Sequence, residues 1–498
     1  MEVTGSNFDE EFDNFKNDLK DAVFVAFDAE FNALLSGEGF KHRLFDTNED
    51  RYNLIKKEAD QLIMTQVGLT MFSYQKERDK YIAKSYTFYL CPQYFGDIDQ
   101  SFVFVASTLK FLRRHRFDFN KFIYGGVPYL SKSEEAVVRK NLKDNVLFNQ
   151  LTRTLQMDDE KLLQDYCSRV SKWLMRSNEP TMYLDVENHI LRYVTHIEVR
   201  MRFPSVVTTD SLGDSRKILI YRDINVEGAI NTPREELENK VLNDLLGFSR
   251  IIALLAESKK PIAGHNLFID TIILHNQFIG PLPNKYKDFK KNIHNMFPIL
   301  YDTKYLSNIM AKKLPYNECW KSNALQEQAG LLLRTKRTMK QGFCFIRLGQ
   351  WVACENRGSF ANVGPREKLK VLEQYCNKVN VIRGAVQYML LIMECFTLDP
   401  TDGATIAVSN IMTLDIVASE LGAYGSIDIK PYGSRAALIA TGSQQVAKKI
   451  LKEFRDSKEY KIAPYHMYTH SPVKRVALWS GALITGGLVL FLLHQKLR

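Results

Sequence analysis

Two carboxylates stand two residues apart, directly after an apolar run near the N-terminus. The run is Val23-Phe24-Val25-Ala26, and Asp28 and Glu30 flank Ala29 just beyond it. Residues i and i+2 of a β-strand project from the same face, so the two acids should point the same way. Neighbouring carboxylates repel and lose hydration unless a cation sits between them. The pattern therefore indicates a divalent-metal site with hard oxygen ligands. The alternative is an exposed strand end with two solvated acids.

A second polar segment lies far along the chain, between Pro261 and Asp270. Its first three residues are long enough only for a short strand, and His265 and Asn266 stand where a helix would begin. Asp270 then falls one turn into that helix and faces back toward its first residues. The alternative interpretation is a polar helix entry, with Asp270 as a first-turn acid that the helix dipole favours.

In this order, the two segments resemble the first three acids of the DEDD 3′–5′ exonuclease superfamily. The likeness is closer to the poly(A)-specific ribonuclease family, and it runs from about residue 8 to about residue 460. The stretches that carry it are Phe8 to Phe31, Arg51-Tyr52 through Gln66-Val67-Gly68-Leu69, Gly264-His265-Asn266 through Pro281-Leu282-Pro283, and Tyr301-Asp302-Thr303-Lys304. This resemblance implies an α/β fold with a ribonuclease H-like exonuclease core.

The resemblance also implies a site and a reaction. Asp28, Glu30 and Asp270 would be the catalytic metal ligands for two Mg²⁺ ions roughly 4 Å apart, with Mn²⁺ as the other candidate ion. Asp28 would contact both ions, Glu30 the ion that activates water, and Asp270 the second ion. The implied reaction is hydrolysis of the terminal phosphodiester of single-stranded RNA.

The chain departs from this family at the fourth aspartate. The family carries it, with a histidine, in a His-Glu-Ala-Gly-Tyr-Asp-like motif a few tens of residues after Asp-Thr-Lys. Here no Asp occurs between Asp302 and Asp399, and no His between His294 and His466. Either the nuclease has become inactive, or the sequence is a variant transcript or gene model that has lost the segment. Recognisable flanks at 322–327 and 342–348 favour the second interpretation.

Residues 160–230 resemble a small nucleic-acid-binding module that interrupts the nuclease. Arg192 and His196 have the Arg-x-x-x-His spacing for which that module is named. On a helix these two residues are neighbours, and they would be able to clamp a phosphate. An ordinary solvated helix face is the alternative.

Other elements follow from periodicity. Phe8, Phe12, Phe15 and Leu19 share one face of an N-terminal helix, and Gln61 to Tyr74 and Tyr86 to Cys91 are predicted strands. Glu235 to Lys259 is predicted as one long helix. Residues 404–455 have a β-α-β-β-α pattern that resembles an RRM. Its central strand, 435–440, lacks the aromatic side chains that stack on bases, which favours an interaction or spacer domain.

The C-terminal region predicts a membrane anchor. Residues 476–493 contain no charge and would form a helix of roughly 27 Å, enough to span a slightly thin bilayer. Lys474 and Arg475 precede this run, and Lys496 and Arg498 follow it. The N-terminus is acidic and has no apolar signal segment, so the body should face the cytosol. The resemblance to the family's membrane-anchored branch favours the mitochondrial outer membrane, with the endoplasmic reticulum as the alternative.

Composition agrees with a cytosolic protein that binds a polyanion. Lys and Arg number 67 against 57 Asp and Glu, which suits RNA or an anionic membrane surface. The seven cysteines are scattered and form no Cys-x-x-Cys pair, which argues for reduced thiols without a disulfide framework or a zinc site.

Together these patterns predict a chain of consecutive segments. In order, these are an exonuclease core at 1–159, an Arg-x-x-x-His-type insertion at 160–230, a second part of the exonuclease core at 231–395, an RRM-like domain at 404–455, a linker at 456–475 and a transmembrane anchor at 476–493. The resemblance to the membrane-anchored branch of the family implies a metal-dependent 3′–5′ exoribonuclease that trims the 3′ ends of PIWI-interacting RNA precursors at the mitochondrial surface. The alternatives are a catalytically impaired membrane-tethered RNA-binding or scaffold protein, and a poly(A) deadenylase. The resemblance implies as partners single-stranded RNA, a PIWI-clade Argonaute, a membrane-resident Tudor-domain protein and the lipid bilayer.

Overall fold

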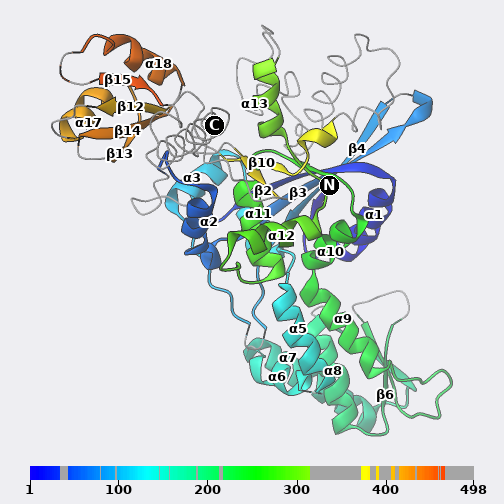
Figure 1. Cartoon of the computed structure of the whole chain (residues 1–498). Coiled ribbons are helices and arrows are strands. Elements are labelled where there is room, and N and C mark those ends of the chain that lie inside the picture. The colour runs from blue at the N-terminus through cyan, green and yellow to red at the C-terminus, as the bar shows by residue number, and fades with distance from the viewer. Residues whose placement is uncertain are drawn as a thin grey trace, which may run out of the picture. The chain divides into compact units, whose positions relative to one another are not determined.

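The structure is a computed structural model of the chain (Figure 1). It describes residues 1–33, 43–78, 80–95, 98–144, 146–155, 157–186, 189–211, 217–313, 372–381, 388–391, 405–409, 414–431, 435–442, 444–457, 459 and 461–465. The chain divides into two units. The first comprises Met1–Leu34, Glu58–His265 and Ile269–Cys376, and the second Leu35–Lys57, Asn266–Phe268 and Asn377–Arg498.

The first unit is built on a mixed sheet with the strand order β1-β4-β3-β2-β8-β9. These strands are β1 (Glu2–Val3), β2 (Ala22–Phe31), β3 (Met64–Gln75), β4 (Lys80–Tyr89), β8 (Ile262–Gly264) and β9 (Leu300–Asp302). Strands β2 and β8 are parallel, as are β8 and β9, whereas β3 is antiparallel to both β2 and β4. The carboxyl ends of β2, β8 and β9 therefore meet at one edge of the sheet.

Helices supply the rest of this unit's core. The predicted N-terminal helix is α1 (Phe8–Asp21), whose Phe8, Phe15 and Leu19 are buried, as its periodicity predicts. The ring of Phe15 packs edge-on against Phe88 of β4 at 5.9 Å. The other helices that cover or flank the sheet are α3 (Ala106–Arg114), α4 (Phe119–Gly125), α11 (Phe268–Leu274), α12 (Tyr286–Met296) and α13 (Thr303–Lys313).

The long helix predicted from Glu235 to Lys259 is wrong, because the structure has two helices there. These are α9 (Arg234–Leu246) and α10 (Phe248–Ser258), which are separated by Gly247 at φ 37°. The backbone passes so close to Pro128 that a Cβ at this position would clash with the Pro128 carbonyl oxygen. Phe248 N donates to the same oxygen at 2.9 Å, so this contact fixes the break.

The inserted module has its own sheet, with the antiparallel order β5-β7-β6. Its elements are α5 (Lys132–Lys143), α6 (Leu147–Thr154), α7 (Met157–Arg176), β5 (Thr181–Asp185), α8 (His189–Arg202), β6 (Val207–Asp210) and β7 (Lys217–Tyr221). One hydrophobic cluster joins Val170, Val194 and Ile218 of the predicted 160–230 insertion with Val138 of α5 and Leu242 of α9. The core shared by these elements thus extends beyond 160–230.

The second unit contains a four-stranded antiparallel sheet in the order β13-β14-β12-β15. Along the chain its elements are β12 (Thr405–Ser409), α17 (Leu414–Gly422), β13 (Ile427–Pro431), β14 (Ala436–Thr441), α18 (Gln444–Glu453) and β15 (Lys461–Pro464). The predicted β-α-β-β-α order is confirmed, and β15 continues it beyond residue 455. This unit also contains α2 (Asn48–Lys56) and the hairpin of β10 (Lys378–Asn380) with β11 (Tyr388–Leu390).

Two sequence predictions fall outside the described residues: the membrane anchor at 476–493 and the segment between 322 and 348 where the family motif is expected. Among the helices that the structure describes, none has the length and hydropathy of a membrane span.

Candidate active site at the sheet edge

Asp28 and Glu30 lie at the carboxyl end of β2. In the pairing with β3, Asp28 stands opposite Gly68 and Glu30 opposite Gln66. Both acids are half-buried, whereas Phe27 and Ala29 beside them are buried. The alternation confirms that the two carboxylates share a face of the sheet.

A buried amide fixes the backbone just beyond these acids. Asn32 is fully buried, and its Nδ2 donates to the carbonyls of Gln61 at 2.6 Å and Val103 at 3.0 Å. Its Oδ1 accepts from Ile63 N at 2.8 Å. Glu30 is held as well, because its own carbonyl accepts from Thr65 Oγ1 at 3.1 Å. The strand end that carries the acids is therefore rigid, as a preorganised site requires.

Strand β8 delivers the next segment to the same edge. His265 and Asn266 form a turn rather than the first residues of the helix, since Asn266 has a φ of 65° and α11 begins at Phe268. Asp270 is nevertheless in the first turn of α11, as predicted. The turn is tied to β9, because Thr303 Oγ1 donates to Gly264 O at 2.9 Å and lies 3.0 Å from His265 Nδ1.

Asp302 is a fourth carboxylate at this edge, and the sequence prediction did not include it among the site residues. It pairs with Gly264 at the end of the parallel strands β8 and β9 and is fully buried. Its Oδ1 accepts from Lys304 N at 2.9 Å and Tyr305 N at 3.4 Å, so it caps α13. The sequence did contain a signal for Asp302. The apolar residues 299–301 are followed directly by Asp-Thr-Lys, a pattern typical of a strand that passes into a helix.

The electrostatics of Asp270 show that these acids act on one another. Burial raises the pKa of the Asp270 carboxyl well above its usual range, and the charges of Asp28, Asp302 and Glu30 raise this pKa further. Every charged side chain that shifts this pKa is therefore an acid. Asp28, Glu30 and Asp270, which come from segments more than 200 residues apart, are therefore brought into one field.

This donor set fits a divalent cation by its chemistry. Half-buried carboxylates that repel one another are stabilised by a doubly charged ion, and Mg²⁺ and Mn²⁺ prefer such oxygen ligands. Within the described part of the chain, however, no group of three or more His, Cys, Asp or Glu side chains is already arranged to hold a metal ion. These carboxylates would therefore have to move closer together when an ion binds.

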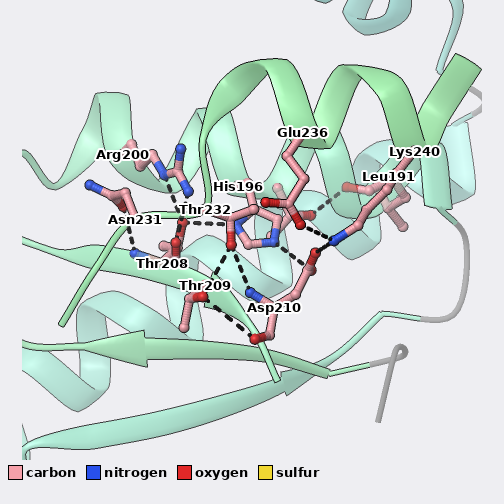
Figure 2. A network of polar contacts seen from close by, with 11 residues as sticks. Leu191, His196, Arg200, Thr208, Thr209, Asp210, Asn231, Thr232, Glu236 and Lys240 are labelled. Carbon is pink, nitrogen blue, oxygen red and sulfur yellow. Dashed lines mark hydrogen bonds and ion pairs between the residues drawn. The ribbon is translucent and has the colours of Figure 1, made fainter. Parts of the chain in front are cut away.

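The two Arg-x-x-x-His residues lie elsewhere, on α8 of the module, and neither predicted setting is correct. Arg192 is 5% exposed and His196 is fully buried, so they form neither a surface clamp nor a solvated face. His196 Nδ1 lies 2.8 Å from Thr208 Oγ1, and its Nε2 lies 3.2 Å from Asp210 Oδ1 (Figure 2). Arg192 lowers the pKa of Asp244, which places its charge near α9. Their burial argues against direct contact with a phosphate.

The helical spacing of Arg192 and His196 predicts their surroundings only in part. Residues i and i+4 do share a face, but that face is covered by β6 and α9 rather than open to solvent. Arg200, one turn further on, joins the same network, because its Nε donates to Thr208 Oγ1 at 2.8 Å and its Nη2 to Thr208 O at 2.7 Å. The whole arrangement is that of a buried structural network.

Comparisons with known proteins identify relatives of the whole chain. The family model described as "CAF1 family ribonuclease" matches residues 3–349. The pre-piRNA 3′-exonuclease trimmer of Bombyx mori is 50% identical over 532 residues, which cover 100% of this chain and 99% of that protein. The poly(A)-specific ribonuclease PNLDC1 of Mus musculus is 26% identical and covers 100% of both chains. Among solved structures, S. pombe Pop2p in its Mg²⁺- and Mn²⁺-bound form aligns at TM-score 0.36 and 13% identity, over 74% of this chain and 96% of that one.

Proposed function

This chain belongs to the CAF1 family of ribonucleases, and we propose that it is a metal-dependent 3′–5′ exoribonuclease that trims precursors of PIWI-interacting RNAs. The observation that carries the proposal is the geometry of one edge of the sheet. There Asp28 and Glu30 share a face at the end of β2, and the parallel strand β8 leads into the turn before Asp270. The substrate follows from the Bombyx relative, whose name specifies pre-piRNA and a 3′-exonuclease.

In the proposed site, Asp28, Glu30 and Asp270 would hold the metal. Mg²⁺ or Mn²⁺, when bound, would activate a water molecule and stabilise the leaving 3′ oxygen of the terminal phosphodiester. Asp270 must release its proton to become a ligand, because its raised pKa favours the protonated form when no cation is bound. Asp302 keeps the N-terminus of α13 in place, and Thr303 holds the β8–α11 turn that positions Asp270.

A second candidate function is a catalytically impaired, membrane-tethered RNA-binding or scaffold protein. It is favoured by the absence of any Asp between Asp302 and Asp399 and of any His between His294 and His466. The alignment with the Bombyx relative spans 532 positions against 498 residues here, so that relative contains residues with no counterpart in this chain. A poly(A) deadenylase is the remaining alternative, and the name of the mouse relative supports it.

We propose that residues 404–455, within the second unit, form an RRM-like domain that serves in protein interaction or as a spacer. Its strand order β13-β14-β12-β15 and its two helices support that fold. The central strands β12 and β14 contain no aromatic residue in Thr405–Ser409 and Ala436–Thr441, so they lack the side chains on which RRM domains stack bases.

We also propose that residues 476–493 anchor the chain in the mitochondrial outer membrane, with the catalytic unit in the cytosol. A membrane-resident Tudor-domain protein and a PIWI-clade Argonaute would then present the RNA. The charge-free run and its basic flanks support an anchor. Deleting residues 476–498 should release the protein from mitochondria to the soluble fraction, and a truncated protein that stays on the membrane would contradict this location.

The decisive experiment is a trimming assay with the purified chain and 5′-labelled single-stranded RNA that ends in a 3′-hydroxyl. We expect products that shorten one nucleotide at a time with Mg²⁺ and no shortening with EDTA. A Glu30→Gln variant is the matched control for contaminating nuclease. Equal rates on poly(A) and on mixed sequence support trimming, whereas strong preference for poly(A) supports deadenylation. Intact RNA under all conditions would contradict the nuclease proposal and support the non-catalytic RNA-binding or scaffold protein.

A further inference from the structure

A basic surface lies on and directly after α3, outside the candidate active site formed by Asp28, Glu30 and Asp270. It consists of Lys110, Arg113 and Arg114 of the helix and Arg116 beyond its end, and we refer to these four residues as the α3 basic patch. All four are exposed, and within the described part of the chain none forms an ion pair. The nearest acid in sequence, Asp118, instead caps α4 and pairs with Lys121 Nζ at 3.6 Å. Folding alone does not account for four unpaired cations gathered on seven residues.

A pocket opens within this patch. It has a volume of about 330 Å³ and is lined by Ala106, Leu109, Lys110, Arg113 and Phe119. Its lining combines apolar and aromatic side chains with two cations. This combination suits a nucleobase that stacks on an apolar surface while the adjacent phosphates contact Lys or Arg.

The patch rests on a rigid support. The Phe119 ring packs edge-on against Phe117 at 4.9 Å and against Phe104 at 6.3 Å. Phe122, which is fully buried, contacts Phe104 at 5.6 Å and Phe102 at 6.0 Å. Phe122 also clusters with Tyr89 of β4, and Phe104 and Phe117, which flank α3, pack against this cluster. The cations are therefore presented between two well-packed segments.

The segment that leads into α3 touches the strand end of the candidate active site. Asn32, two residues after Glu30, donates to Val103 O at 3.0 Å, and α3 begins three residues later at Ala106. The nine-residue helix is roughly 14 Å long. An RNA strand whose 3′ end lies at Glu30 can therefore reach the patch with nucleotides a short way upstream.

We propose that the α3 basic patch binds single-stranded RNA upstream of the nucleotide being removed. This inference rests on the proposed function, since it assumes that the 3′ end lies at the carboxylate cluster. The patch would contact phosphates through Lys110, Arg113, Arg114 and Arg116 and accept a base in the pocket beside Phe119. Recognition would be independent of sequence, because both contacts are available to every nucleotide. An anionic lipid surface is the competing partner, since Phe111, Ile123 and Tyr124 are exposed nearby. The concave pocket and the connection to Glu30 through Asn32 favour RNA.

The test compares two charge reversals of the same size in the full chain. Lys110→Glu/Arg113→Glu changes the patch, and Lys140→Glu/Lys143→Glu changes two exposed residues with the same spacing at the end of α5. Affinity is measured in EDTA by fluorescence anisotropy, with one RNA of about 16 nucleotides and one of about four. Binding is read without hydrolysis, so a parent chain that binds RNA but does not trim it contradicts the proposed function and not this inference.

We expect the patch variant to bind the longer RNA on the order of tenfold more weakly. The slope of the logarithm of the binding constant against the logarithm of the salt concentration should become less steep by about 1.4, as for the loss of two phosphate contacts. The short RNA and the α5 variant should change by less than about twofold. The neutral variant Lys110→Gln/Arg113→Gln should give an intermediate loss, and thermal unfolding confirms that each variant folds. Equal losses in the two reversals would overturn the proposal. So would unchanged RNA affinity with lost binding to phosphatidylserine vesicles, which would assign the patch to lipid.

Discussion

His196 Nε2 lies 3.2 Å from Asp210 Oδ1, across the contact between α8 and β6. Burial alone would raise the pKa of Asp210, but hydrogen bonds from His196 and Lys240 hold this pKa well below its usual range. Because an ionised carboxylate only accepts, Nε2 of His196 must carry the hydrogen, and Nδ1 then accepts from the Thr208 hydroxyl. Burial lowers the pKa of His196, in agreement with a neutral ring. The network therefore runs in one direction, from Arg200 through Thr208 and His196 to Asp210.

This network predicts a large stability effect at Asp210. The variant Asp210→Asn should lower the free energy of unfolding by about 1–3 kcal/mol, because His196 and Lys240 both lose their charged acceptor. Lys240 also pairs at 2.8 Å with Glu236, whose side chain is 53% exposed. Glu236→Gln is thus the matched control, with an expected loss below about 0.5 kcal/mol. Urea unfolding of both variants measures the difference, and equal losses would contradict a buried role for Asp210.

Asp244 on α9 predicts a pH dependence of stability. Burial, helped by the charge of Asp9, raises the pKa of Asp244 to about 7, against the opposite effects of Arg192 and Arg250. The folded chain then holds a proton that the unfolded chain releases near pH 3.8. The stabilisation is therefore complete below pH 3.8 and is lost as the pH rises toward 7.

We expect Asp244→Asn to remove this dependence. The parent should lose at most about 4 kcal/mol of unfolding free energy across that interval through this group, and the variant should lose much less. Unfolding by urea at a series of pH values, with Asp9→Asn as a partial control, measures the slope. A variant with the same slope as the parent would show that another group titrates.

The hydroxyl of Thr303 joins the two strand ends at the candidate site. It donates to Gly264 O at 2.9 Å, so His265 Nδ1, at 3.0 Å, must be the donor of the second bond. Thr303→Val keeps the shape and removes both bonds, which should cost about 1–3 kcal/mol of unfolding free energy. Thr303→Ser keeps the hydroxyl and should cost much less. Thermal unfolding of the pair decides whether the hydroxyl, and not the volume of the side chain, supports the turn.

The sequence identified the chemistry of the site better than its surroundings. Alternation along β2 predicted correctly that Asp28 and Glu30 share a face, because side-chain direction in a strand follows from spacing alone. Spacing did not show that Asp302 lies at the same edge of the sheet, since that depends on the pairing of β8 with β9, which are separated by more than 30 residues.

The same limit explains the errors in the module and at Gly247. The helical spacing of Arg192 and His196 was correct, but which face of α8 is covered depends on β6 and α9, and local sequence does not report it. Gly247 interrupts a helical pattern because Pro128, a residue distant in sequence, approaches its backbone. Both features are tertiary contacts that override local periodicity.

Removing either strand carboxylate should abolish trimming without loss of the fold. Asp28→Ala or Glu30→Ala takes away a proposed metal ligand, and we expect activity to fall at least about 100-fold. Stability without metal should stay the same or rise, because the pKa of Asp270 moves back toward its usual range when a neighbouring charge is removed. Asp13→Ala, at an exposed acid on α1, is the control. Trimming at the parent rate by either site variant would show that the metal lies elsewhere.

The last prediction concerns the missing fourth aspartate. Inserting a His-Glu-Ala-Gly-Tyr-Asp-type segment between Glu327 and Gly342 should raise the trimming rate of the purified chain by at least about 100-fold if the deficit is catalytic. The matched control is the same insertion with its His and its last Asp replaced by Ala.

If the deficit lies instead in delivery of RNA, the insertion changes little, and the proposed membrane-resident Tudor-domain partner raises the rate. Central strands β12 and β14 without aromatic residues give a physical reason to expect weak capture of RNA by the second unit. Measuring the parent, each addition alone and both together on a 3′-extended single-stranded RNA separates these cases, because independent deficits multiply in rate. A parent chain that is fully active without either addition would contradict both explanations, and it would mean that the carboxylates of Asp28, Glu30 and Asp270 suffice with another ligand from this chain.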